Sequence, residues 1–203
     1  MRDCLIVGKT HAGKTLFVLN FAQYLGLDNV DLIFKYPNGL IEKKTYSIAK
    51  ARRELVGPIP HTTRALQTVS IDLPVGKGVK RCFLTDTSGL IDHIHSDVEV
   101  RRAIAQTLGA IREADLILHL VDAAAVGVSD APTALGEVDY QVAQFAQVRG
   151  GYAILANKMD LPGAVSGLAK LKLELPGHRL FPISALYKRG FREVKSYVQH
   201  LLC

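Results

Sequence analysis

The chain has 203 residues, of which 48% are hydrophobic and 22% charged, and its 25 Lys and Arg exceed its 19 Asp and Glu to give a net charge of +6. This composition is typical of one globular domain and excludes disordered, collagen-like and coiled-coil chains. The moderate positive charge permits an anionic partner without requiring one. Cys4, Cys82 and Cys203 form no zinc or disulfide pattern, so we expect reduced thiols in a cytoplasmic protein.

Short apolar runs alternate with helical patterns along the chain. We expect strands at residues 4–7, 65–73, 79–85, 116–121, 152–156 and 180–183. We expect helices at residues 14–25, 98–111, 138–148, 166–173 and 191–202. This order predicts an α/β fold with a doubly wound, mainly parallel sheet, to which the hairpin at residues 65–85 adds an antiparallel edge.

Residues 26–61 fit this alternation poorly. Pro37-Asn38-Gly39 predicts a turn, and residues 46–55 could form a basic helix. A connection of this length is usually functional or mobile.

A glycine-rich loop follows the first expected strand. Residues 8–15, GKTHAGKT, match the phosphate-binding pattern G-x-x-x-x-G-K-[ST] and precede a helix, the context that supports the motif. Backbone N–H groups and the helix N-terminus would face a phosphate. The Lys14 ammonium would bind the β- and γ-phosphates, and the Thr15 hydroxyl would bind a Mg²⁺ ion. The expected nucleotide-binding residues here are Lys9, Thr10, His11, Ala12, Gly13, Lys14, Thr15 and Leu16.

A second polar loop ends the hairpin. The Asp86 carboxylate can hold Mg²⁺, and the Gly89 N–H can face a γ-phosphate. Upstream, Thr63 is our choice for a hydroxyl that closes over Mg²⁺, with Thr62 as the alternative. The expected metal ligands are therefore Thr15, Thr63 and Asp86, and the expected catalytic groups belong to Lys14, Thr63 and Gly89.

A third loop, Asn157-Lys158-Met159-Asp160, follows the strand at residues 152–156. The Asp160 carboxylate can accept hydrogen bonds from the N1–H and amino group of guanine, which adenine cannot offer, and such a site can reject the wrong base by about 10⁴-fold. Asn157 can bond the base and brace the phosphate loop, and the Lys158 stem can lie along the base. Ser184-Ala185-Leu186 can offer backbone N–H groups to the guanine O6.

These motifs occur in the order GKTHAGKT, TTR, DTSGL, NKMD and SAL, and they resemble those of translation-factor-type small GTPases. The stretch from Asp86 to Asp122 is particularly similar to the Era-like group, which includes the G domains of Era, MnmE, EngA and FeoB. The resemblance implies a Ras-like P-loop fold over residues 1–203 as a single G domain, with an atypical, extended first switch at about 26–63. It also implies Mg²⁺·GTP binding and hydrolysis to GDP.

Two positions depart from the resemblance. Leu90 stands where Ras-like proteins carry the glutamine that orients the attacking water, as in other Era-like proteins, so hydrolysis needs another group or a partner. His11 stands where potassium-activated members carry an asparagine, which puts potassium stimulation in doubt. Asp92, His93, His95 and Glu99 could position water, or they could be solvated loop and helix residues.

The basic residues Lys43, Lys44, Lys50, Arg52 and Arg53 could face RNA, the ribosome or an anionic membrane surface, or form a solvated face. A protein effector or activator and a homodimer through the G domain are further expected partners. The sequence thus favours a slow GTPase switch. The alternatives are a GTP/GDP-binding module with negligible hydrolysis and a P-loop ATPase, and Asn157 and Asp160 argue against the ATPase.

Overall fold

We describe the chain from a computed structural model over residues 2–57, 65–92, 96–128, 135–149 and 151–202, leaving out the side chains of residues 147–149. The strands are β1 (Arg2–Val7), β2 (Asn29–Lys35), β3 (Ile41–Ser47), β4 (Leu66–Val75), β5 (Gly78–Asp86), β6 (Leu116–Asp122), β7 (Tyr152–Asn157) and β8 (Arg179–Pro182). The helices are α1 (Lys14–Tyr24), α2 (Ile48–Leu55), α3 (Val98–Glu113), α4 (Ala123–Val128), α5 (Glu137–Arg149), α6 (Ala164–Glu174) and α7 (Phe191–Leu202).

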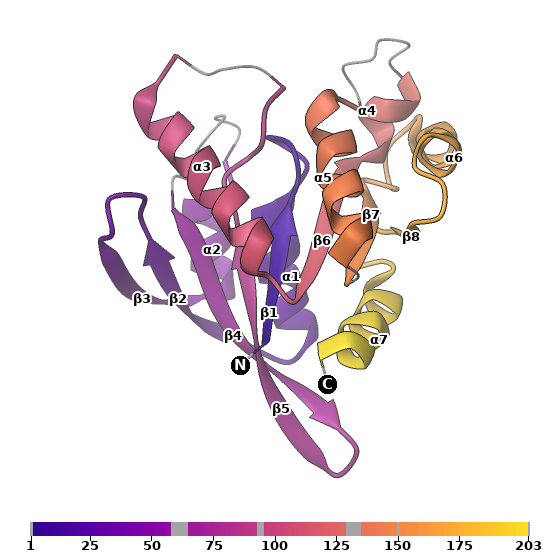
Figure 1. Cartoon of the computed structure of the whole chain (residues 1–203). Helices are drawn as coiled ribbons and strands as arrows, with labels where there is room; N and C mark the ends of the chain where they lie inside the picture. The colour runs from indigo at the N-terminus through magenta and orange to yellow at the C-terminus, as the bar shows by residue number, and fades with distance from the viewer. Residues whose placement is uncertain (1, 58–64, 93–95, 129–134, 150, 203) are drawn as a thin grey trace.

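The described strands form one sheet in the order β3-β2-β4-β5-β1-β6-β7-β8. The neighbouring strands β5, β1, β6, β7 and β8 pair in parallel. At the other side of the sheet, β3, β2, β4 and β5 form antiparallel pairs. Parallel strands end at the same edge, so the loops after β1, β5, β6 and β7 gather at one end of the molecule (Figure 1). Both termini and the β4–β5 turn lie at the opposite end.

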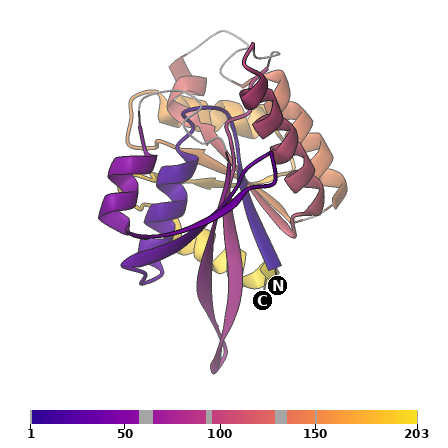
Figure 2. The same ribbon diagram turned by 90° about the vertical axis from the view of Figure 1, so that its left-hand side faces the viewer.

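Helices cover both faces of the sheet, as the sequence predicts (Figure 2). On one face α1, α2 and α7 pack around three stacked or edge-on rings, Phe17, Phe21 and Phe191, whose centroids lie 5.2–5.5 Å apart. On the other face α3, α5 and α6 bury residues such as Ile111, Ala143 and Leu171. Side chains alternate between these two cores along β1, because successive residues of a strand point to opposite faces.

Residues 26–57 are more regular than the sequence pattern indicated. They form the hairpin of β2 and β3, with the predicted turn over residues 36–40, followed by α2. The prediction of a helix from residue 46 was wrong at its start: Tyr46 and Ser47 belong to β3, and the Ser47 hydroxyl caps α2 by accepting from the Lys50 N–H at 3.3 Å. The hairpin of residues 65–85 forms as predicted but is not the edge, because β2 and β3 pair outside β4.

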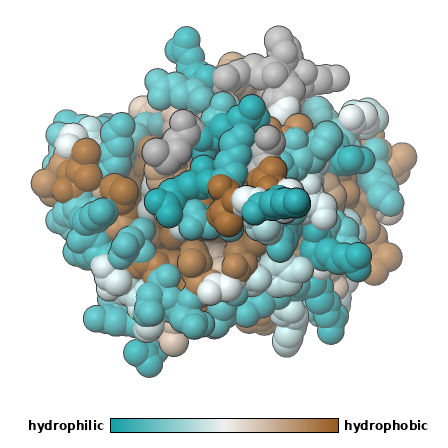
Figure 3. All heavy atoms as spheres, turned by 90° about the horizontal axis from the view of Figure 1, so that it is seen from below, coloured by the Kyte–Doolittle hydropathy of each residue, from teal (hydrophilic) through white to brown (hydrophobic). Residues whose placement is uncertain are grey.

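Short α4 directly follows β6 within an apolar run that gave no separate helical signal. Within the described ranges, each helix is too short or too polar to cross a bilayer. At the end of the molecule that carries the termini, hydrophobic side chains come to the surface in separate groups between hydrophilic ones (Figure 3).

Candidate functional site

The loop between β1 and α1 encloses a buried cation. Lys14 opens α1, its side chain is 7% exposed, and its Nζ donates to the carbonyl of Lys9 at 2.9 Å. Burial lowers the pKa of Lys14 to about 8, against the opposing charges of Asp86 and Asp139. His11 is exposed and has a φ of 64°, so its side chain lies outside the loop. The Lys14 ammonium is therefore buried inside the loop, where a backbone carbonyl of the loop binds it.

The end of β5 brings a carboxylate to the same place. The Thr15 hydroxyl donates to Asp86 Oδ2 at 2.6 Å, although 71 residues separate them. Asp86 is 1% exposed, and burial raises its pKa to about 6, while Lys14, Thr15 and the Thr87 N–H act to lower it. Among the described residues, Asp86 Oδ1 and the Thr10 hydroxyl are buried without a hydrogen-bond partner. Buried polar atoms rarely lack partners, so these atoms fit a site completed by a ligand.

The chain beyond Asp86 lies tightly on the phosphate loop. The Leu90 N–H donates to the Gly8 carbonyl at 3.1 Å, which extends the strand pairing into the loop. A Cβ on Gly89 would lie 2.5–2.8 Å from atoms of Thr10, so only glycine permits this approach. The Leu90 side chain is 1% exposed and packs in the apolar core, where it cannot orient a water molecule.

On the other side of the phosphate loop, Asn157 joins three loops. Its side chain is 2% exposed, its Nδ2 donates to the Ala12 carbonyl at 2.8 Å, and its Oδ1 accepts from the Ala185 N–H at 2.9 Å. The Ala185 carbonyl in turn accepts from Asn20 of α1 at 2.6 Å. Because an unpaired buried amide is costly, this bonding fixes the relative position of the loops.

The loop after β7 and the loop after β8 meet beside Asn157. The Ser184 hydroxyl donates to Asp160 Oδ1 at 2.5 Å, and the Lys158 ammonium pairs with Asp122 at the end of β6 at 2.5 Å. A pocket of about 250 Å³ opens here. It is lined by Gly13, Leu16, Asn157, Lys158, Asp160, Leu161, Ala185 and Leu186. A flat apolar ring can lie between such walls with its polar edge toward the Asp160 carboxylate.

The structure thus brings residues 8–16, 86–90, 157–160 and 184–186 to one edge of the sheet. Thr62, Thr63, His93 and His95 lie outside the described residues. Asp92 bonds to Lys9 and to the start of α5, and Glu99 pairs with Arg102 on α3 at 2.7 Å. A role of either carboxylate in positioning water stays a prediction.

Among the basic residues of 43–53, Lys44, Lys50 and Arg52 make contacts within the chain. Arg52 donates to Asn20 at 2.6 Å and to Gln23, and therefore braces α1. Lys44 pairs with Glu42 at 2.8 Å and Lys50 with Glu54 at 3.8 Å. These three residues therefore also pair within the chain, and an RNA, ribosome or membrane partner for the segment stays a prediction.

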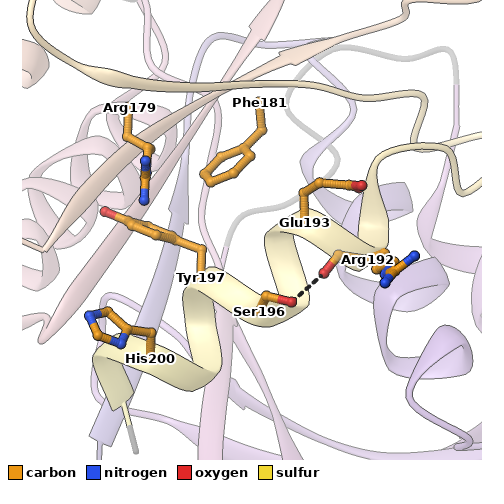
Figure 4. Close-up of a pocket in the computed structure, with 7 residues that line it drawn as sticks. All are labelled: Arg179, Phe181, Arg192, Glu193, Ser196, Tyr197 and His200. Atoms are coloured by element: carbon orange, nitrogen blue, oxygen red, sulfur yellow. Dashed lines mark hydrogen bonds between the residues drawn. The ribbon is translucent and has the colours of Figure 1, made fainter.

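A separate groove lies between β8 and α7, away from the loops described above (Figure 4). The Arg179 guanidinium lies over the Tyr197 ring at 5.7 Å, and Phe181 contacts the same ring at 5.2 Å. The side chains of Arg179, Phe181 and Tyr197 thus pack against one another within the groove. The sequence pattern did not predict this groove.

Sequence reasoning missed several residues that hold the loops. They are His119 and Asp122 of β6, Asn20 of α1 and Asp139 of α5. Asp122 had a usable signal, because it ends a buried strand just as Asp86 does. Asn20 and Asp139 lie on helices whose patterns do not reveal their partners.

A parallel sheet whose first strand leads through a glycine-rich loop into a helix, with a base-sized pocket beside it, defines the class of P-loop nucleotide-binding proteins. A family model described as "50S ribosome-binding GTPase" matches residues 45–158, more than half of the chain. The chain therefore belongs to this GTP-binding GTPase family.

Curated relatives agree with this assignment. The chain is 29% identical over 160 residues to the GTPase Obg of Desulfosudis oleivorans, covering 77% of this chain and 46% of Obg. It is 34% identical over 156 residues to the tRNA modification GTPase MnmE of Rhodopseudomonas palustris, covering 76% of this chain and 31% of MnmE. The chain spans less than half the length of these relatives.

Solved structures share the fold. A crystal structure of an Aquifex aeolicus Era variant bound to GDP·AlF4⁻ superposes with a TM-score of 0.67 at 20% identity, covering 99% of this chain and 57% of Era. The G domain of the T. maritima FeoB iron transporter superposes with a TM-score of 0.58 at 15% identity, covering 100% and 99% of the two chains.

Proposed function

We propose that this chain binds GTP with Mg²⁺, hydrolyses it to GDP and phosphate, and acts as a nucleotide-controlled switch. The observation that carries the proposal is the contact of Thr15 with Asp86 at 2.6 Å beside the buried Lys14. A hydroxyl, an unsatisfied carboxylate oxygen and a cation form a polar centre at the start of a helix, which suits a polyphosphate and its metal ion.

The phosphates would lie along residues 9–16, with the Lys14 ammonium released from the Lys9 carbonyl to bind their oxygens. In this proposal Lys14 and the Gly89 N–H neutralise charge on the γ-phosphate, and the hydroxyl of Thr63 closes over the site. Placing fixed donors where charge develops is the main means by which enzymes assist phosphoryl transfer.

Mg²⁺ would be held by Thr15, Asp86 and Thr63, and when bound it would neutralise phosphate charge. The described residues contain no cluster of three His, Cys, Asp or Glu side chains that could bind a metal alone. Mg²⁺ is usually bound through one or two carboxylates, here Asp86, and completes its shell with other oxygens, phosphates and water. An Era structure that shares the fold contains MgGDPNP.

Guanine would occupy the pocket beside Asp160. Its N1–H and amino group would meet the carboxylate, which Ser184 already holds by one oxygen. The Ala185 N–H, which also donates to Asn157 Oδ1, and the neighbouring Ser184 and Leu186 would line the O6 side of the base. The stem of Lys158 would cover the base. An ATP-binding protein is disfavoured, because adenine would leave the Asp160 carboxylate unpaired. Competition of ATP against GTP for binding tests this point.

The main alternative is a GTP/GDP-binding regulatory module that scarcely hydrolyses GTP. The burial of Leu90 favours it, since the side chain at this position cannot orient water. Single-turnover hydrolysis with Mg²⁺, with and without potassium, distinguishes the two functions. A rate well above that of free GTP supports a GTPase, and a rate equal to it supports the module.

In this proposal residues 1–203 act as one G domain, with residues 26–63 as the first switch and the segment from Gly89 to about Asp97 as the second. The partner of the GTP state would be a protein effector or activator, the ribosome or its RNA, an anionic membrane surface, or a second G domain. The family description and an Era complex with 16S ribosomal RNA make the ribosome the first partner to test. Capture of purified ribosomes by the protein loaded with a non-hydrolysable GTP analogue, but not with GDP, would support this partner.

A further inference from the structure

The side chain of Lys9, the second residue of the phosphate loop, points away from Lys14. Its ammonium pairs with Asp92 Oδ2 at 2.5 Å and lies 3.6 Å from Asp139 Oδ2. The Lys9 side chain is only 21% exposed, and its carbonyl accepts the Lys14 ammonium. One residue therefore touches both the phosphate-binding cation and the segment that follows β5.

Asp92 is fixed by two contacts. Besides Lys9, its Oδ1 accepts from the Val138 N–H in the first turn of α5 at 2.9 Å. A Cβ on Gly136, just before α5, would lie 2.1 Å from Asp92 Oδ2 and 2.2 Å from the Lys9 Nζ. The ion pair therefore lies directly against the backbone of Gly136, and a side chain here would displace it.

A buried chain of hydrogen-bonded polar groups stands next to the Lys9 ammonium. Asp139 is 2% exposed and accepts from the Gly136 N–H at 2.9 Å. Its other oxygen lies 2.9 Å from His119 Nε2, and His119 Nδ1 lies 2.9 Å from the Tyr152 hydroxyl. Burial raises the pKa of Asp139, but the hydrogen bond and charge of His119, the Gly136 N–H and Lys9 outweigh it, so the pKa lies below its ordinary value. The negative charge that holds Lys9 is therefore secure.

The same segment sets the position of Gly89. Leu90 is bonded to Gly8 and its side chain is anchored in the core, and Asp92 follows two residues later. Two restraints therefore follow Gly89 along the chain: the strand pairing of Leu90 with Gly8 and, two residues later, the ion pair of Lys9 with Asp92.

We propose that Lys9 and Asp92 are positioning residues for GTP hydrolysis, which hold the Gly89 N–H against the phosphate loop where the γ-phosphate would lie. This inference rests on the proposed function. Lys9 acts through Asp92 and does not bind phosphate with its ammonium. Since a misplacement of about 1 Å can slow a reaction about 100-fold, one ion pair at this point has a large effect on the rate.

The first test is a double-mutant cycle with Lys9→Met, Asp92→Asn and the double variant, with Lys172→Met on the exposed side of α6 as the matched control. We expect each single variant to slow single-turnover hydrolysis about tenfold or more, the double variant to be no slower than either, and GDP affinity to change less than about twofold. Lys9→Arg should restore most of the rate.

Three results would overturn the inference: equal losses of GTP and GDP affinity with an unchanged rate, additive losses in the double variant, or faster hydrolysis. Failure of the proposed function would appear instead in the unmutated chain, as absent GTP binding or turnover.

A second measurement does not need turnover. In the nucleotide-free protein, hydrogen exchange at the Leu90 amide, which donates to Gly8, should be at least about tenfold faster in Lys9→Met and Asp92→Asn than in the Lys172→Met control. Unchanged protection of this amide would show that the ion pair does not hold the segment, and the inference would fail.

Discussion

The two sides of the phosphate loop are built differently. On the base side, Asn157 joins the Ala12 carbonyl to the Ala185 N–H, and Ser184 already holds Asp160. On the phosphate side, Asp86 keeps a buried oxygen without a partner among the described residues, and the next segment is tied by the pair of Lys9 with Asp92. In the proposed function the base side is held together by hydrogen bonds within the chain, whereas the phosphate side would be completed by the nucleotide and its metal ion. Such a division suits the proposed switch, in which the base side would bind GTP and GDP alike and the phosphate side would respond to the γ-phosphate.

The largest effect should come from the cation of the phosphate side. In Lys14→Ala the buried ammonium is lost and the phosphate charge is left unpaired, so GDP affinity should fall about a hundredfold or more. Fluorescent-nucleotide titration measures it, with Lys172→Ala as the control. Retained micromolar affinity would show that Lys14 does not face the phosphates.

On the base side, Asp160→Asn should weaken GDP binding about a hundredfold, because two charge-assisted hydrogen bonds to guanine are lost. Xanthine carries an oxygen where guanine carries its amino group, and the new amide can donate to it, so XDP affinity should rise. Competition between GDP and XDP measures the change. If the variant still prefers GDP as strongly as the original chain does, the base does not lie at Asp160.

The preassembled side should also contribute more to stability. Asn157→Ala leaves a buried carbonyl and N–H unpaired and should lower the free energy of unfolding by about 2–3 kcal/mol. Lys9→Met on the phosphate side should lower it by about 1 kcal/mol or less, because the ion pair is partly exposed. Urea unfolding without nucleotide compares the two variants, and a larger loss in Lys9→Met would reverse the comparison.

The smallest expected effect is on how the free energy of unfolding changes at acidic pH. Because the pKa of Asp139 is depressed from its ordinary 3.8 in the folded chain, its contribution to stability is present above about pH 4 and is lost as the pH falls through the folded pKa. Asp139→Asn should therefore be less stable at neutral pH and show a flatter loss of stability below pH 4. Equal acid slopes for the two proteins, measured by urea unfolding at several pH values, would contradict this reading.

Most of the parallel half of the fold could be predicted, because each buried strand is a compact apolar run that ends in a polar loop. Within residues 26–57 the turn and most of α2 could be predicted, but the strands β2 and β3 could not. β3 is exposed along almost its whole length and its sequence lacks an alternating apolar face. Tertiary pairing with β2, rather than local preference, makes it a strand.

The candidate site divides in the same way. Phosphate and base loops are contiguous motifs at strand ends, so their residues can be read directly. The support of Lys9 by Asp92 and Asp139 joins three distant segments, and a pattern along one chain does not reveal such contacts. Thr63 stays a prediction, because it lies outside the described residues.

The central claim is that four loops grip a guanine nucleotide through a preassembled base side and a phosphate side that the ligand completes. Calorimetric titration of the chain with GDP and with ADP, each with Mg²⁺, tests it most directly. We predict micromolar or tighter binding of GDP and binding of ADP weaker by about 10⁴-fold. Equal affinity for the two nucleotides, or no binding of GDP, would contradict the claim.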